Sequence, residues 1–143
     1  MKVLVIGGGG FLGSGITRKL IKEDNEVSIV GRKEYPEFKS VANSIQADVR
    51  NRSDMVFAIK DQDVVFHTAA IPGIWGNYND YYLTDVKGTE NIIYACLKNK
   101  VKKLIYTSSP SVIFNGCDMK GVDENTPYPN KYLCHYAKTK AIA

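Results

Sequence analysis

The fold is decided near the start of the chain by residues 2–20, KVLVIGGGGFLGSGITRKL. A short run of Val, Leu and Ile comes first, which is typical of a buried parallel strand. Four consecutive glycines follow, and after them Leu12, Ile16 and Leu20 recur at the i, i+4, i+8 spacing of a helix that packs one apolar stripe against a sheet. A strand, a glycine-rich turn and a helix beginning near Phe11 predict the first unit of an α/β domain.

The rest of the chain repeats this alternation of apolar strands and helix-length segments. Strands are predicted over residues 2–6, 26–31, 44–47, 63–67 and 102–108. Helices are predicted from residue 11, after residue 53, over residues 79–99 and from about residue 131. Because crossovers between parallel strands are right-handed, this succession predicts a doubly wound parallel sheet of the Rossmann type with strand order 3-2-1-4-5. We therefore expect a single dinucleotide-binding domain over residues 1–143.

The composition excludes several classes of protein. Hydrophobic residues make up 44% and charged residues 24% of the 143 residues, which fits a globular domain and does not indicate disorder. The net charge of +4 is scattered, so no nucleic-acid partner is expected. No apolar run approaches the roughly 18 residues of a membrane span, and no signal peptide precedes the glycines, so we expect a cytoplasmic protein. Three cysteines without a C-x-x-C spacing argue against a metal site or a disulfide framework.

The predicted helix over residues 79–99 carries apolar residues on more than one side. These are Leu83, Val86, Ile92, Ile93, Cys96 and Leu97. One side is expected to pack on the sheet, and the other would suit a partner subunit, as in a homodimer.

The glycine run fits two spacings of a phosphate-binding loop, Gly8-x-Gly10-x-x-Gly13 and Gly7-x-x-Gly10-x-x-Gly13. In either case, residues without a β-carbon permit a tight turn and a close approach of the backbone to a ligand. The helix N-terminus that follows presents free N–H groups to a pyrophosphate. The position of these glycines between a strand and a helix predicts binding of a nicotinamide dinucleotide.

The end of the second predicted strand, Val30-Gly31-Arg32-Lys33, bears on the choice of cofactor. A carboxylate there would bind the ribose of NAD, whereas a basic residue accommodates the 2′-phosphate of NADP. No carboxylate is present and two cations are, so NADP is favoured and NAD is the alternative. The other interpretation is that Arg32 and Lys33 are simply exposed loop charges.

Three Tyr-x-x-x-Lys pairs occur in this tyrosine-rich chain: Tyr35 with Lys39, Tyr94 with Lys98, and Tyr136 with Lys140. The spacing alone decides nothing, because nine tyrosines produce such pairs by chance. Only the last pair follows the fifth predicted strand, on a helix that can face the ligand edge of the sheet. Residues at i and i+4 share a helix face, so the ammonium group of Lys140 would favour the phenolate form of Tyr136. Such a pair can move a proton to or from a substrate oxygen.

Taken together, these motifs resemble an extended short-chain dehydrogenase/reductase, a family that also includes epimerases and dehydratases. The shared elements are the glycine loop, Asp48-Val49, His67-Thr68-Ala69-Ala70, Thr107-Ser108-Ser109 and the pair Tyr136 and Lys140. The resemblance implies that the catalytic residues are Ser109, Tyr136 and Lys140, with Ser108 as the alternative serine. It implies that the cofactor-binding residues are Gly7, Gly10, Phe11, Leu12, Gly13, Arg32, Asp48, Val49, Ala69, Ala70 and Lys140.

Three segments are most similar to the 3β-hydroxysteroid dehydrogenase-like branch, and within it to bacterial 2-alkyl-3-oxoalkanoate reductases. They are residues 71–76, 106–112 and 128–136. Trp75 is either a substrate-side aromatic or a loop anchor. The chain departs from the family at Ile6, where many members have threonine, and at Asp85, where asparagine is usual. A carboxylate at position 85 would change the hydrogen bonds near Lys140 or pair with it.

The resemblance implies an NADP-dependent oxidoreductase that transfers a hydride to or from a carbonyl or secondary alcohol of a small hydrophobic substrate. That substrate would be a 3-oxo acid or a molecule like a 3β-hydroxysteroid. Since the family builds its substrate pocket largely from a later region, the 143 residues are expected to be an N-terminal fragment that binds cofactor with little turnover. Two alternatives stay open: a sugar-nucleotide epimerase or dehydratase, and a non-catalytic NADP-binding regulator.

Overall fold

The computed structural model describes residues 1–143, and its centre is a parallel sheet of five strands in the order β3-β2-β1-β4-β5. The strands are β1 (Lys2–Ile6), β2 (Glu26–Gly31), β3 (Asn43–Gln46), β4 (Val64–His67) and β5 (Lys103–Tyr106). All four pairings are parallel, so every strand ends at the same edge of the sheet. The predicted fold class and strand order are confirmed.

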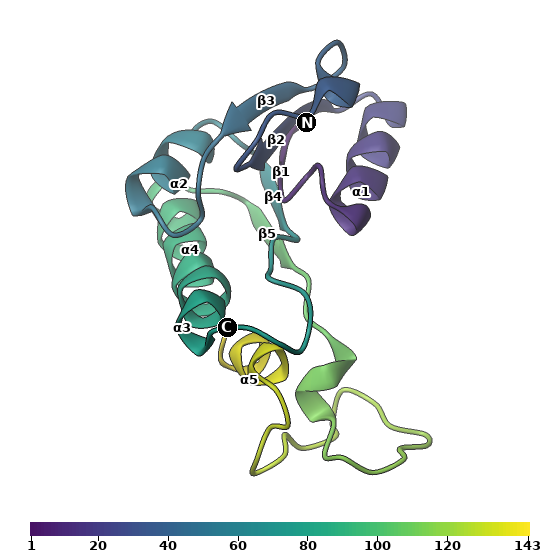
Figure 1. Ribbon diagram of the computed structural model, residues 1–143. Helices are drawn as coiled ribbons and strands as arrows, with labels where there is room; N and C mark the ends of the chain where they lie inside the picture. Colours follow the sequence, from purple (N-terminus) through teal and green to yellow (C-terminus); the bar gives the residue numbers. More distant parts are fainter.

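Helices cover both faces of the sheet (Figure 1). Helix α1 (Phe11–Lys22) lies on one face, and α2 (Arg52–Ala58) and α4 (Gly88–Lys98) lie together on the other. The two faces have separate cores because side chains alternate along each strand. Leu4 and Ile6 pack toward α2 and α4 in the larger core, whereas Val5 packs toward α1 in the smaller one.

The helix predicted over residues 79–99 is continuous but not regular. It consists of α3 (Tyr78–Tyr81), the π-helical segment η2 (Tyr82–Lys87) and α4. A wider π turn changes which residues face inward, and here the inward residues include Asp85, which is 1% exposed. Ile92 and Cys96 pack into the core as expected, while Ile93 and Leu97 are exposed.

Three details of the prediction are wrong. Leu12 does not face the sheet, since its side chain is 48% exposed; Gly13 and Thr17 are buried instead. Gly13 packs directly against the carbonyl of Gly7, and this contact sets the rotation of α1.

The fifth strand and the last helix have different bounds from those predicted. Strand β5 ends at Tyr106 rather than at residue 108, because the carbonyl of Thr107 accepts a hydrogen bond from a lysine instead of a neighbouring strand. The last helix, α5 (His135–Ile142), begins four residues later than predicted. Cys134, the residue before α5, is in an extended conformation. The short helix η3 (Pro110–Ile113) packs against α5.

No helix in this structure is both long enough and apolar enough to cross a membrane.

Candidate functional site

The geometry of the glycine loop decides between the two spacings that the sequence allows. Gly7 has a φ of +84°, which favours glycine, and a β-carbon there would lie 2.8 Å from the backbone nitrogen of Ala69. A β-carbon on Gly13 would overlap the carbonyl oxygen of Gly7. The spacing Gly7-x-x-Gly10-x-x-Gly13 therefore contains the turn and the close helix contact, although Gly8 also packs tightly, against Ile29.

The N-terminus of α1 is open to an anion. Its N-cap is Gly10, which has no side chain to accept a hydrogen bond, and no acidic residue lies in the first turn. The N–H groups of Phe11 and Leu12 have no partner within the helix. The side chain of Phe11 is fully exposed, so these two residues would contact a pyrophosphate through their N–H groups.

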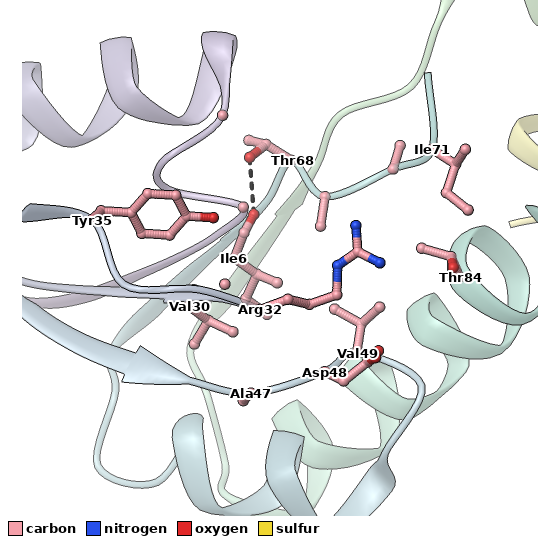
Figure 2. Close-up of a pocket in the computed structure, with 15 residues that line it drawn as sticks. Ile6, Val30, Arg32, Tyr35, Ala47, Asp48, Val49, Thr68, Ile71 and Thr84 are labelled. Atoms are coloured by element: carbon pink, nitrogen blue, oxygen red, sulfur yellow. Dashed lines mark hydrogen bonds between the residues drawn. The ribbon is translucent and has the colours of Figure 1, made fainter. Parts of the chain in front are cut away.

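A cavity of about 270 Å³ lies next to this loop at the carboxyl ends of β1, β2, β3 and β4 (Figure 2). It is lined by Ile6, Gly7, Gly10, Val30, Gly31, Arg32, Tyr35, Ala47, Asp48, Val49, Thr68, Ala69, Ala70, Ile71 and Thr84. Seven of the residues predicted to bind the cofactor are among them: Gly7, Gly10, Arg32, Asp48, Val49, Ala69 and Ala70. Four are not: Phe11, Leu12, Gly13 and Lys140.

The electrostatics of this cavity are set by Arg32, Asp48 and Arg50. Figure 2 shows the guanidinium of Arg32 reaching into the space above Asp48 and Val49. The side chain of Arg50 donates three hydrogen bonds to the Asp48 carboxylate, the shortest 2.6 Å long, and holds the pKa of that carboxyl below its usual range. Arg32 forms no ion pair, so its charge is available to a bound anion.

Sequence reasoning missed several lining residues. The Thr68 hydroxyl donates a hydrogen bond of 2.9 Å to the carbonyl of Ile6 and packs beside the glycine turn. Tyr35 lays its ring over Gly9, filling the space that a side chain there would need. Ile71 and Thr84 close the other end of the cavity. Thr68 carried the clearest signal, since it directly follows a predicted strand within the motif His67-Thr68-Ala69-Ala70.

Lys140 is almost fully buried at the end of β5. Its ammonium group donates a hydrogen bond of 2.7 Å to the carbonyl of Thr107 and lies 4.0 Å from the ring centre of Tyr106. Burial lowers the pKa of Lys140, and the charge of Asp85 opposes that effect. The amine is thus fixed at the carboxyl edge of the sheet, although it does not line the cavity.

Tyr136 lies one turn before Lys140 on α5 and is partly exposed. Ser109 caps η3: its hydroxyl accepts a hydrogen bond from the N–H of Ser111 and lies 2.7 Å from the Ser111 hydroxyl. Because η3 packs against α5, the serine and the tyrosine–lysine pair are on adjoining elements. The three side chains form no direct hydrogen bond with one another.

Asp85 lies near Lys140 and does not form the ion pair with it that was one of the two expectations from the sequence. Its carboxylate accepts hydrogen bonds from the N–H of Ile71, at 3.1 Å, and from the hydroxyl of Thr139, at 2.7 Å. Burial raises the pKa of Asp85.

His67 is a buried polar residue behind the site, and no role was assigned to it from the sequence beyond its place in the motif His67-Thr68-Ala69-Ala70. The Thr89 hydroxyl donates to the carbonyl of Asp85 at 2.6 Å, so His67 donates to Thr89 through Nε2, at 3.0 Å. Its Nδ1 has no partner. Burial and the charge of Lys140 lower the pKa of His67 to about 3, so the ring is neutral.

Comparison with known proteins gives consistent results. Residues 4–143 match the model of the 3-beta hydroxysteroid dehydrogenase/isomerase family. A 2-alkyl-3-oxoalkanoate reductase of Shewanella oneidensis is 41% identical over 97% of this chain and 36% of its own length. Human sterol-4-alpha-carboxylate 3-dehydrogenase, decarboxylating, is 36% identical over 96% of this chain and 37% of its own length.

Solved structures share the fold. A UDP-galactose 4-epimerase has a TM-score of 0.88 and 29% identity, covering 99% of this chain and 48% of the epimerase. MoeE5 in complex with UDP-glucose and NAD has a TM-score of 0.85 and 29% identity, covering 99% of this chain and 46% of that one. The chain thus spans less than half the length of the relatives that it matches.

Proposed function

Because the chain belongs to the 3-beta hydroxysteroid dehydrogenase/isomerase family, we propose that it forms the cofactor-binding part of an NADP-dependent oxidoreductase. The reaction is hydride transfer between NADP and a carbonyl or secondary alcohol of a hydrophobic substrate. One observation carries the proposal: a glycine-lined cavity and a buried lysine, one turn after a tyrosine, lie at the same edge of the sheet. Residues 1–143 act as one dinucleotide-binding domain.

The residues present fit a dinucleotide. The uncapped N-terminus of α1 and the close-packed glycine turn suit a pyrophosphate, and the cavity beside Asp48 and Val49 suits an adenosine. The unpaired guanidinium of Arg32 supports NADP, because it can pair with a 2′-phosphate. Several similar structures were solved with NAD, which keeps NAD as the alternative.

Three side chains would act on the substrate oxygen. Tyr136 donates a proton to it during reduction, and Lys140 stabilises the phenolate that is left behind. Ser109 donates a hydrogen bond to the same oxygen as charge develops there. The nicotinamide, when bound, supplies or accepts the hydride.

The substrate class is proposed from the relatives and from one exposed loop. Relatives are named as acting on a 2-alkyl-3-oxoalkanoate and on sterol carboxylates, which are large apolar molecules carrying an acid group. In this chain Ile74 and Trp75 are 60% and 87% exposed in the loop after β4. Apolar side chains at that edge support a long-chain 3-oxo acid or a steroid-like substrate.

The fold also supports a sugar-nucleotide epimerase as a second candidate, since similar structures include UDP-sugar epimerases. The absence of a carboxylate at the end of β2 favours the NADP reductase. A non-catalytic regulator is disfavoured because Tyr136 is retained and Lys140 is held in place.

The test is consumption of NADPH with a long-chain 3-oxo acid and with a 3-ketosteroid. It is measured on the complete gene product that includes residues 1–143 and on the 143-residue chain alone. We expect turnover by the former and little by the latter. Tyr136→Phe should lower kcat at least about 100-fold, as expected for loss of a general acid. The control is Tyr94→Phe, which alters a tyrosine of the same Tyr-x-x-x-Lys spacing outside the site.

Two results would contradict the proposal. Turnover that survives Tyr136→Phe would remove the assigned proton donor. Conversion of a UDP-sugar, with no reduction of either ketone, would support the epimerase instead.

A further inference from the structure

Tyr35 fills the space at the end of β2, and no step of the proposed reaction uses it. One edge of its ring, Cδ1 and Cε1, lies against Gly9, while the opposite edge and the hydroxyl lie against Gly31. A β-carbon on either glycine would overlap the ring. Tyr35 is therefore held between the glycine loop and the last residue of β2.

The backbone and the core also hold Tyr35 in place. Its side chain packs on the smaller core, which contains Ile29 and Phe38. Tyr35 precedes Pro36, which restricts it to extended backbone conformations, and its carbonyl accepts a hydrogen bond of 3.0 Å from the N–H of Phe38. The position of the ring is thus fixed before any ligand binds.

Gly31 occupies the position at which a carboxylate would bind the ribose of NAD. Its φ is not positive, so its backbone does not require glycine. The Tyr35 hydroxyl takes the space that a side chain on Gly31 would need. The chain therefore presents a hydroxyl where a carboxylate would otherwise lie. A carboxylate repels a phosphate, whereas a phenol hydroxyl can donate a hydrogen bond to it.

This hydroxyl is free to bind a ligand. Figure 2 shows it pointing toward the glycine turn, with no hydrogen bond to any of the residues that line the cavity. Arg32, the next residue after Gly31, is the one arginine in that lining. The carbonyl of Arg32 accepts a hydrogen bond of 3.0 Å from the side chain of Gln46, which fixes the start of the loop after β2.

We propose that Tyr35 is a cofactor-selecting residue: its ring excludes a carboxylate from position 31, and its hydroxyl donates a hydrogen bond to the 2′-phosphate of NADP beside the charge of Arg32. This inference rests on the proposed function, since it names how the cavity would distinguish NADP from NAD. Both of its parts can be measured by binding and unfolding, without turnover.

The donor role is tested with Tyr35→Phe, which keeps the ring against both glycines and removes the hydroxyl. The probes are adenosine 2′,5′-bisphosphate and adenosine 5′-monophosphate, which differ only in the 2′-phosphate. Their dissociation constants are measured by NMR titration of the 143-residue chain. We expect Tyr35→Phe to weaken binding of the bisphosphate about tenfold or more, because a hydrogen bond to a charged group is lost, and to leave the monophosphate unchanged. Tyr94→Phe, on α4 outside the cavity, should change neither.

Equal weakening of both probes in Tyr35→Phe, or weakening of neither, would overturn the donor role and leave cofactor binding in place. A parent chain that binds neither probe would overturn this inference together with the proposed function. Tyr136 and hydride transfer take no part in these titrations, so loss of the assigned proton donor would be a separate result.

The exclusion of a carboxylate is tested with Gly31→Asp, made alone and together with Tyr35→Ala. Alone, the new side chain overlaps the ring, so the midpoint of urea unfolding should fall. With Tyr35→Ala the same change should lower the midpoint less, because the two residues are in contact and their effects do not add. The double variant should also bind the monophosphate more tightly than the bisphosphate, since like charges repel. An equal fall in the two backgrounds would refute the exclusion.

Discussion

Gly13 shows how one missing side chain sets the shape of the site. A β-carbon there would overlap the carbonyl of Gly7, whose left-handed conformation forms the turn before α1. The two glycines together bring the N-terminus of the helix against the end of β1. The position of the open N–H groups at the start of α1, next to the cavity, depends on this contact.

Gly13→Ala is therefore expected to abolish NADPH binding and to destabilise the chain by about 1–3 kcal/mol, as overpacking does. The matched control is Gly15→Ala in the same helix, where a β-carbon meets nothing within 4 Å. That change should stabilise the helix by about 0.5–1 kcal/mol and leave binding intact. Urea unfolding measures the stability of the two variants, and fluorescence titration with NADPH measures their binding. Normal binding by Gly13→Ala would contradict the assignment of the loop.

His67 makes the stability of the chain depend on pH. Its pKa in the folded chain is about 3, below the ordinary value of 6.5, so the unfolded chain takes up a proton in this interval that the folded chain does not. Stability is therefore full above pH 6.5 and falls as the pH is lowered toward 3. The steepest slope is about 1.4 kcal/mol per pH unit.

His67→Gln should remove the part of the slope below pH 6.5 that this ring contributes. Glutamine can place an amide N–H near the position of Nε2 and keep the bond to Thr89. The measurement is the free energy of unfolding from urea titrations at several pH values. An unchanged slope in the variant would mean that another group is responsible.

At the scale of elements, the strands could be predicted well and the ends of helices less well. The runs of Val and Ile in β1, β2 and β4 mark buried parallel strands, so their positions follow from composition. The start of α5 does not, because Cys134 offers no side-chain cap and the helix is ordered by packing against η2 and η3. The π turn in η2 could not be predicted, because no residue type in this segment marks it. The structure reveals it, together with the buried, inward position of Asp85.

The loop after β4 is tied to α3 by Tyr81. This side chain is 1% exposed, and its hydroxyl lies 3.1 and 3.0 Å from the carbonyls of Gly73 and Trp75. Tyr81→Phe leaves those carbonyls without this donor and should cost about 1–2 kcal/mol of stability. Amide hydrogen exchange in residues 71–77 should be faster in Tyr81→Phe than in the parent chain. The control is Tyr82→Phe, because the Tyr82 hydroxyl forms no hydrogen bond; an equal effect of both would contradict the anchoring role.

At the scale of the molecule, the strand order and the ligand edge could be predicted because the right-handed crossover rule leaves few arrangements. The cavity lies at that edge, beside β1, where the order of the strands reverses: β2 and β3 follow on one side and β4 and β5 on the other. The polar cluster behind it could not be predicted in the same way. The bond between Asp85 and Thr139 spans 54 residues, and only the packing of α5 on η2 creates it.

The central claim is that this chain binds NADP in the cavity beside the glycine loop. It is tested most directly by titrating ¹⁵N-labelled chain with NADPH and following the backbone amide signals. We predict saturable shifts centred on Gly7, Gly10, Arg32, Asp48 and Ala69, with NADPH binding more tightly than NADH. Absence of saturable shifts, or shifts confined to residues far from that cavity, would contradict the account.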